Sequence, residues 1–265
     1  MRPFNVVNFA EIGSTNERVK AALASGHTEG YVCRAQKQTG GYGRQGRLWT
    51  SPEGGLYQSL LLRPKNYTAP LPTLGLVMSL SIRAALLRLA SLPHDAVRIK
   101  WPNDVLVGDD KIAGISMEAS AGGVCMGMGV NIFHPTDVTE LLADDRYEPA
   151  YFADMAIGYT EQGQIFFGNG YTFDKKQDAI AAVGDAILSA FAQCYPVWLE
   201  NGFGPFKREF ISCNYLMGKF VRMQLLNGDV IAEGLACGID DSGCLLVDEG
   251  TTVTAVNSGE AHVLY

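Results

Sequence analysis

The stretch Gln38–Trp49, QTGGYGRQGRLW, is the segment around which the rest of the chain is organised. It holds four glycines and two arginines, a composition too flexible for a helix or a strand. Glycine lets backbone N–H groups approach a ligand closely, and Arg44 and Arg47 offer rigid donor forks suited to phosphate or carboxylate oxygens. The stretch predicts a loop that wraps a small anion, against the plainer alternative of a solvated hairpin loop.

The spacing of Gly41, Gly43 and Gly46 also matches the dinucleotide-binding pattern G-x-G-x-x-G. That motif should open a helix and be followed about 20 residues later by an acidic residue. Here the chain instead runs through Pro52 and a glycine pair into a predicted strand at residues 55–63. No Gly-Lys-Ser/Thr follows the loop either, so the pattern supports neither a Rossmann site nor a P-loop.

The composition of the 265-residue chain is that of a globular enzyme, with 47% hydrophobic and 18% charged residues. Its net charge of −7 gives no support to nucleic-acid binding, which needs a broad basic face. The six cysteines show no C-x-x-C spacing, so we assign no metal site and no redox motif. We see no signal peptide and no apolar run of about 18 residues. These features predict a cytoplasmic protein that binds neither nucleic acid nor membranes.

The N-terminal segment reads as a strand at residues 5–12 followed by a helix. The sequence STNE predicts a capping box, with Ser14 as the N-cap residue and Glu17 three positions later. Capping alone explains these residues, and a ligand-binding role requires that the helix N-terminus point into a pocket. Predicted strands at residues 31–36 and 55–63 flank the glycine-rich loop.

A second informative stretch is residues 97–119, VRIKWPNDVLVGDDKIAGISMEA. Pro102 interrupts an otherwise apolar strand pattern, and such irregular backbone is typical of a functional site. Lys111 follows a tight turn and, taken alone, is a solvated hairpin charge. The predicted strand at residues 124–132, VCMGMGVNI, has glycines that leave one face without side chains, so that a ligand or another backbone can lie close to it. Asn131 near its end could form hydrogen bonds with the amide edge of a ligand.

The remaining chain completes two domains. Apolar residues at helical spacing predict helices at residues 72–92 and 174–201, a short helix at 205–211, and another near 137–143. Short strands divided by turns follow Gly218 and predict a β-barrel of about 50 residues. We place the domains at residues 1–213 (catalytic) and 214–265 (C-terminal).

The motifs GYGRQGRLW, SPEGGLYQS, KWPND, KIAGISMEA and GVNI, with STN upstream, together resemble the biotin protein ligase family. The resemblance covers residues 5–132 and 203–260. It implies an α+β fold, a mixed sheet flanked by helices as in lipoate ligases, with an SH3-like small β-barrel at the C-terminus. It also implies an enzyme that forms biotinyl-5′-AMP from biotin and ATP, with Mg²⁺, and transfers biotin to a lysine of a biotin carboxyl carrier protein.

The resemblance also implies the site residues, position by position. Lys111 would touch the biotin carboxylate and the α-phosphate, Arg44 would hold the adenylate, and Asp104 would steer the incoming lysine. The residues assigned to biotin are Ser14, Thr15, Asn16, Gln38, Tyr42, Gly43, Arg44 and Lys111. Those assigned to ATP or the adenylate are Arg44, Arg47, Trp49, Asn103, Lys111 and Asn131.

One position departs from the family, which usually has arginine where this chain has Tyr42, so only a backbone contact is carried over there. The sequence begins at the catalytic domain, so we expect the monofunctional type without an N-terminal DNA-binding domain. A homodimer and the identity of the acceptor, acetyl-CoA carboxylase or another biotin-dependent carboxylase, stay open.

Two alternatives compete with this interpretation. A lipoate or octanoate ligase or transferase on the same scaffold would need a longer apolar tunnel and no polar partners for a ureido ring. A non-catalytic sensor of biotinyl-adenylate would have no need of Lys111, Asp104 and both loop arginines.

Overall fold

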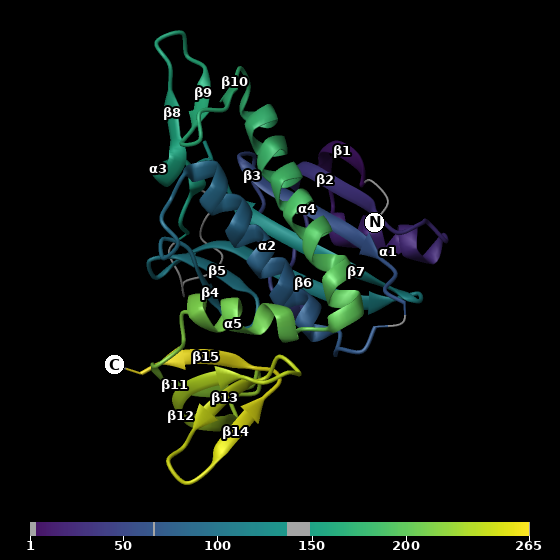
Figure 1. Ribbon diagram of the computed structural model, residues 1–265. Helices are drawn as coiled ribbons and strands as arrows, with labels where there is room; N and C mark the ends of the chain where they lie inside the picture. Colours follow the sequence, from purple (N-terminus) through teal and green to yellow (C-terminus); the bar gives the residue numbers. More distant parts are fainter. Residues whose placement is uncertain (1–3, 66, 137–148, 265) are drawn as a thin grey trace.

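The structure is a computed structural model that describes residues 4–65, 67–136 and 149–264 (Figure 1). Its larger part is built on seven strands: β1 (Asn5–Ile12), β2 (Tyr31–Gln38), β3 (Gly55–Leu62), β4 (Arg98–Lys100), β5 (Asp104–Val107), β6 (Asp110–Ser120) and β7 (Gly123–Asn131). They form one mixed sheet in the order β1-β2-β3-β7-β6-β5-β4. β1 and β2 run parallel, and every other neighbouring pair is antiparallel.

Helices pack on both faces of this sheet: α1 (Thr15–Ala24) on one, α2 (Pro72–Ala90) and α4 (Lys176–Asn201) on the other. The alternation of side chains along each strand divides the core accordingly. Cys33 and Leu61 pack under α1, whereas Val32 and Leu60 belong to the larger cluster beneath α2 and α4. The predicted strands and long helices are therefore confirmed.

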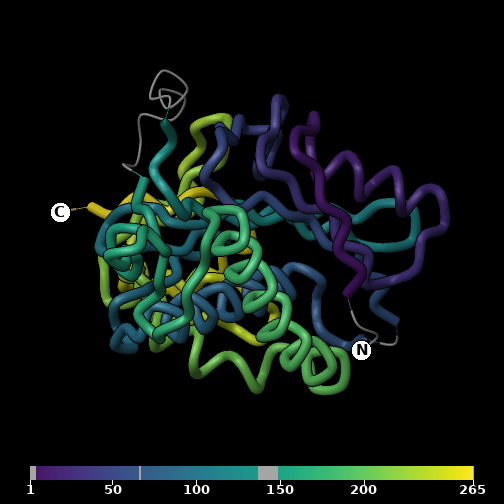
Figure 2. Tube along the Cα trace, turned by 90° about the horizontal axis from the view of Figure 1, so that it is seen from above, coloured from purple at the N-terminus to yellow at the C-terminus, as the bar shows by residue number. Residues whose placement is uncertain are grey.

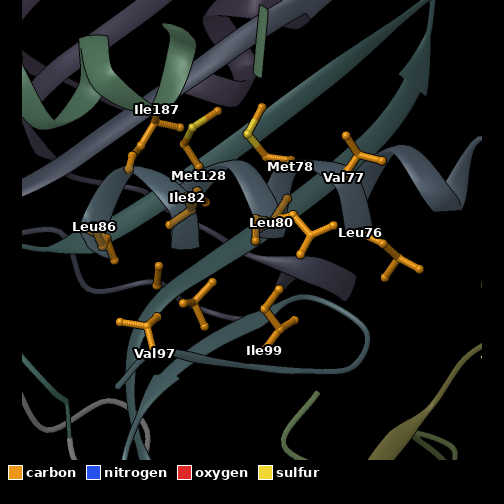
Figure 3. Packing of buried hydrophobic residues seen from close by; sticks show 14 of the residues in the cluster. Leu76, Val77, Met78, Leu80, Ile82, Leu86, Val97, Ile99, Met128 and Ile187 are labelled. Atoms are coloured by element: carbon orange, nitrogen blue, oxygen red, sulfur yellow. The ribbon is translucent and has the colours of Figure 1, made fainter. Parts of the chain in front are cut away.

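The larger cluster is centred on α2 (Figure 3). Its side chains meet Ile187 from α4, Met128 from β7 and Ile99 from β4, all buried. Because α2 is apolar almost all round, it is suited to a fully buried position. The sheet face carrying α1 is covered over only part of its area, and the functional site lies on the remainder.

Neither α2 nor α4 contains an unbroken apolar run of about 18 residues, because charged residues interrupt both sequences. Both α2 and α4 are long and apolar enough to cross a membrane by length and composition alone. The apolar window of α2 is 78% buried inside the protein and that of α4 is 39% buried. Packing against the sheet accounts for the apolar character of α2.

The C-terminal part is a second sheet that lies below α5 (Gly204–Cys213) in Figure 1. Its strands are β11 (Phe220–Gln224), β12 (Val230–Ile239), β13 (Leu245–Asp248), β14 (Val253–Val256) and β15 (Glu260–Val263). They are antiparallel in the order β14-β13-β12-β11-β15. The indole Nε1 of Trp101 donates to the carbonyl of Gly243 at 2.9 Å, which joins this sheet to the larger domain. The expected α+β architecture is confirmed, and the domain border after residue 213 stays a prediction.

A small excursion completes the fold. It consists of α3 (Phe152–Ala156) and a three-stranded sheet of β8 (Ile157–Tyr159), β9 (Ile165–Phe167) and β10 (Thr172–Phe173), at the end of the molecule farthest from the C-terminal sheet. Seen from above, β1 and α1 lie at one side and the C-terminal strands lie mostly under the other half (Figure 2). The helix predicted near residues 137–143 lies outside the described residues.

Candidate functional site

A cavity of about 500 Å³ lies over the uncovered part of the sheet face that carries α1. Segments far apart in the sequence form its walls: the N-terminus of α1, the glycine-rich loop, the KWPND segment, β6, β7 and the C-terminal strand β15. Of the predicted site residues it is lined by Thr15, Asn16, Gln38, Tyr42, Gly43, Arg44, Arg47, Trp49, Asn103, Asp104 and Lys111.

The amide of Asn16 lies over a row of three cross-strand neighbours and is held by two of them. Ser59, Gly127 and Ser116 are paired directly across β3, β7 and β6. Asn16 Nδ2 donates to Ser116 Oγ at 3.1 Å, and Asn16 Oδ1 accepts from Ser59 Oγ at 2.6 Å. We call Asn16 with Ser59, Gly127 and Ser116 the Asn16 seat. A Cβ at Gly127 would lie 2.1 Å from Asn16 Oδ1, so the Asn16 seat exists only because the residue between the two serines has no side chain.

The N-terminus of α1 is satisfied by a residue from β2. The backbone N–H and the hydroxyl of Thr15 donate to Gln38 Oε1 at 2.8 and 3.0 Å. Ser14 is the N-cap residue, but its side chain makes no cap hydrogen bond, and Glu17 pairs with Lys20 instead of folding back. The predicted capping box was therefore wrong, because the Glu17 carboxylate that would close it is taken by Lys20 and by the long-range partner Tyr42.

A second row on the same sheet face carries the charges. Asp104 is the cross-strand neighbour of Gly114, and Lys111 Nζ forms an ion pair with Asp104 Oδ1 at 2.8 Å. Lys111 also lies 5.1 Å from the ring centroid of Trp49. The indole packs directly over Gly129, where a Cβ would come within 2.4 Å of Nε1. That Nε1 is buried and has no hydrogen-bond partner among the described residues, as expected of a donor waiting for a ligand.

The two loop arginines point to different parts of the chain. Arg44 Nη1 donates to Asn103 Oδ1 at 2.9 Å. Burial lowers the pKa of the Arg44 guanidinium, the nearby Arg47 lowers it further, and Asp104 opposes both. Arg47 forms an ion pair with Glu260 of β15, so the loop is tied to the C-terminal domain. Between these residues the chain turns through a left-handed residue, Gln45, with φ 59°.

A smaller cavity of about 120 Å³ adjoins the first, and Leu48, Trp49 and Lys111 line both. Asn131 lies in this second cavity, where its Nδ2 donates to the carbonyl of Lys111 at 3.2 Å. The other lining residues are Thr50, Pro52, Glu53, Gly55, Tyr57, Phe133, Pro135, Pro149 and Tyr151. Lys111 therefore stands at the junction of two compartments.

Comparison with known proteins assigns this arrangement to a family. A model of the biotin/lipoate A/B protein ligase family matches residues 9–132, and a model of the biotin protein ligase C-terminal domain matches residues 216–263. The biotin–[acetyl-CoA-carboxylase] ligase of Paracoccus denitrificans is 31% identical over 244 residues, covering 90% of this chain and 92% of that protein. The chain belongs to the biotin protein ligase family.

Two further relatives align with nearly the whole length of this biotin protein ligase. The bifunctional ligase/repressor BirA of Bacillus subtilis is 30% identical over 260 residues, which cover 95% of this chain and 72% of that protein. The solved biotin protein ligase from Aquifex aeolicus in complex with biotin and ATP has a TM-score of 0.75 at 26% identity, with 98% of each chain covered. The predicted function of an ATP-dependent biotin protein ligase is confirmed, and the lipoate or octanoate alternative is not favoured.

The structure separates the predicted site residues of this biotin protein ligase into three groups. Eleven residues meet in the larger cavity, as given above. Asn131 lines only the smaller one, and Ser14 is buried outside both. Sequence reasoning missed Ser59 and Ser116, which hold Asn16, and Glu260, which holds Arg47. A polar residue inside an apolar strand was the available signal for both serines.

Proposed function

We propose that the biotin ring system binds over Asn16 and that its carboxylate points to Lys111, where ATP meets it. In the first step a carboxylate oxygen attacks the α-phosphorus, the bond to the β-phosphate breaks, and pyrophosphate leaves. In the second step the amino group of an acceptor lysine attacks the acyl carbon of biotinyl-5′-AMP, AMP leaves, and an amide forms. The observation that carries this assignment is the convergence of Lys111, Asp104 and Arg44 on one cavity with the Asn16 seat.

The ureido end of biotin suits the polar groups around α1. Its N–H groups and carbonyl need acceptors and donors, and Thr15, Asn16 and Gln38 offer both inside the cavity. Asn16 Nδ2 and Gln38 Nε2 each donate one of their two hydrogens to a serine hydroxyl. A lipoyl or octanoyl chain would leave the second hydrogen of each amide desolvated and unpaired, at a cost of about 1–3 kcal/mol for each group. This contrast explains selection of biotin over an apolar acid of similar length.

The cations of the site oppose the repulsion between two anionic substrates. At about 4 Å and an effective dielectric constant near 20, each pair of like charges opposes approach by about 4 kcal/mol. Lys111, Arg44 and Arg47 supply positive charge from two separate segments, held in place before the reaction begins. The glycine-rich loop that carries both arginines also shields the adenylate from water.

The ion pair between Lys111 and Asp104 must open when substrates bind. The ammonium group of Lys111 exchanges the Asp104 carboxylate for the oxygens of biotin and the α-phosphate. Asp104 then lies free beside the acyl carbon, where it attracts the ammonium of the acceptor lysine and receives its proton. One ion pair thereby keeps both charged groups positioned in the resting enzyme, where Asp104 is only 18% exposed.

The smaller cavity fits the adenosine half of ATP. Trp49, Tyr151 and Asn131 line it and offer aromatic faces and an amide, which suit a purine. Magnesium would arrive with the ATP phosphates. The described residues contain no cluster of three or more His, Cys, Asp or Glu side chains placed to hold a metal ion, so the fit to a protein-held metal is poor and no step is assigned to it.

The partner that we propose is the biotin carboxyl carrier protein of acetyl-CoA carboxylase or of another biotin-dependent carboxylase. The name of the Paracoccus denitrificans relative supports acetyl-CoA carboxylase. A cytoplasmic location, the absence of nucleic-acid and membrane binding, and a homodimer stay predictions.

The test uses the purified chain, ATP, Mg²⁺ and a biotin carboxyl carrier domain, with labelled biotin or labelled lipoate. We expect transfer of biotin alone. Lys111→Ala should reduce pyrophosphate release by about 10²-fold or more while the protein keeps its fold. Lys65→Ala, a substitution outside both cavities, is the matched control. Turnover of Lys111→Ala near the wild-type rate would refute the role of this lysine.

A further inference from the structure

Tyr42 lines the larger cavity, and its side chain belongs to a cluster to which the proposed mechanism assigns no role. Its hydroxyl donates to Glu17 Oε1 at 2.7 Å. Lys20 Nζ lies 2.7 Å from the same oxygen, 3.0 Å from Glu118 Oε2 and 5.3 Å from the centroid of the Tyr42 ring. Glu17 and Lys20 belong to α1, and Glu118 belongs to β6. The cluster therefore connects the glycine-rich loop to the helix that carries Thr15 and Asn16.

The loop is a folded unit that one anchor can hold. Tyr42 and Leu48 face each other as a bridge, Gly43 N donates to the Arg47 carbonyl at 2.8 Å, and Trp49 N donates to the Gly41 carbonyl at 3.0 Å. Because these bonds close the segment on itself, fixing Tyr42 also limits where the tip between the two arginines can move.

At its start the loop is already tied down, because Gln38 accepts from Thr15 and the Thr39 and Gly40 amides donate to the carbonyls of Ile12 and Gly13. Beyond Gly41, two anchors besides Tyr42 involve the substrate-binding arginines. Arg44 is held by Asn103 and Arg47 by Glu260. If both guanidinium groups turn toward phosphate oxygens, as the proposed function requires, these contacts weaken when ATP binds. The contacts of Tyr42 to α1 involve no group that must meet a substrate, so they can persist throughout the reaction.

The chemistry of the cluster favours tyrosine over arginine. The phenol is neutral, donates to Glu17, and presents a ring face that attracts the Lys20 ammonium. An arginine here would add a second cation beside Lys20 and compete with it for Glu17. Two like charges about 5 Å apart repel, and the repulsion is strongest where the groups are partly desolvated, as Lys20 is at 25% side-chain exposure.

We infer that Tyr42 is a positioning residue that anchors the glycine-rich loop to α1 before any ligand binds, and so presets the biotin end of the site. This inference rests on the proposed function for its consequence on biotin. The anchoring of the loop does not depend on the proposed function, because the order of the loop can be measured without an activity assay.

Trypsin provides that measurement, since Arg44 and Arg47 are cleavage sites within the loop. We compare ligand-free wild type with Tyr42→Ala, Tyr42→Phe and Tyr42→Arg, following cleavage after these arginines by mass spectrometry. Tyr42→Ala should be cut about threefold faster or more, Tyr42→Phe should lie in between because its ring still faces Lys20, and Tyr42→Arg should not restore protection. Tyr171→Ala, which removes a tyrosine with 64% exposure on the distant excursion, is the control.

Biotin affinity gives the second measurement. Tyr42→Ala should raise the dissociation constant of biotin about threefold to tenfold, with the KM for ATP unchanged and a melting temperature close to wild type. Cleavage of Tyr42→Ala at the wild-type rate would overturn the anchoring. Faster cleavage with unchanged biotin affinity would overturn the positioning role. Absence of biotin ligation by the wild type would count against the proposed function and leave the trypsin result valid.

Discussion

Replacing Gly127 with alanine tests the geometry of the biotin end of the site. A Cβ at this position would lie 2.1 Å from Asn16 Oδ1 and 2.6 Å from Ser116 Oγ, whereas ordinary contact begins at 3.4 Å. The Asn16 amide must therefore move by roughly 1 Å or the strands must separate. Either movement breaks the hydrogen bonds that Asn16 makes with Ser116 and Ser59.

The expected rise in the KM for biotin follows from the loss of those two hydrogen bonds. At about 1 kcal/mol for each bond, their loss weakens the preformed seat by about 2 kcal/mol, which corresponds to roughly a 30-fold rise in the KM for biotin. Overpacking also costs about 1–3 kcal/mol of stability, so the melting temperature should fall by a few degrees without loss of the fold.

Gly129→Ala is the internal comparison, because it lies two residues along the same face of β7. Its Cβ would meet Trp49 Nε1 at 2.4 Å and leave Asn16 untouched. The assay measures pyrophosphate release as biotin and ATP are varied separately. We expect Gly127→Ala to raise mainly the KM for biotin and Gly129→Ala to raise mainly the KM for ATP.

The control is Gly75→Ala on α2, where an added Cβ has no atom within 4 Å, and which should leave both KM values unchanged. A biotin KM within about twofold of wild type in Gly127→Ala would refute the seat for biotin. Equal effects of Gly127→Ala and Gly129→Ala on the two substrates would refute the division of the site into a biotin end and a nucleotide end.

Three further predictions concern other parts of the molecule. Arg44→Gly should weaken retention of biotinyl-5′-AMP and let it escape to modify bystander lysines; unchanged retention on dialysis would contradict that role. Trp101→Phe removes the hydrogen bond to Gly243 and should lower the free energy of unfolding by about 1 kcal/mol, measured in urea; an unchanged midpoint would show that this bond does not hold the domains together. Burial raises the pKa of the Cys33 thiol to about 12 and that of Cys213 to about 11, above the ordinary 9.0. Both thiols then stay protonated in the folded state, so their contribution to stability should be constant below pH 9 and fall as the pH rises toward 11. Cys33→Ala should therefore make the melting temperature fall less steeply over that range.

Much of the site was predictable from the sequence because its chemistry is concentrated in short segments. Three segments carry it: the glycine-rich loop with its arginines, the interrupted strand KWPND, and the lysine after the turn. A purely structural role explains few such combinations of residue types. Eleven of the predicted residues line one cavity. The glycine spacing of β7 also indicated a close approach, and the structure shows that Asn16 and Trp49 make it.

The sequence by itself determined the fold class, through strand and helix periodicity, and the identity of the charged groups, through motif composition. Only the tertiary structure decided which groups meet. Ser59 and Ser116 reach Asn16 through strand register, and Arg47 meets Glu260 from 213 positions away. Glu17, expected to close a local cap, instead accepts from Tyr42 of the loop. The physical reason is that local patterns report backbone preference and burial, whereas the partner of a polar group depends on which strands lie side by side.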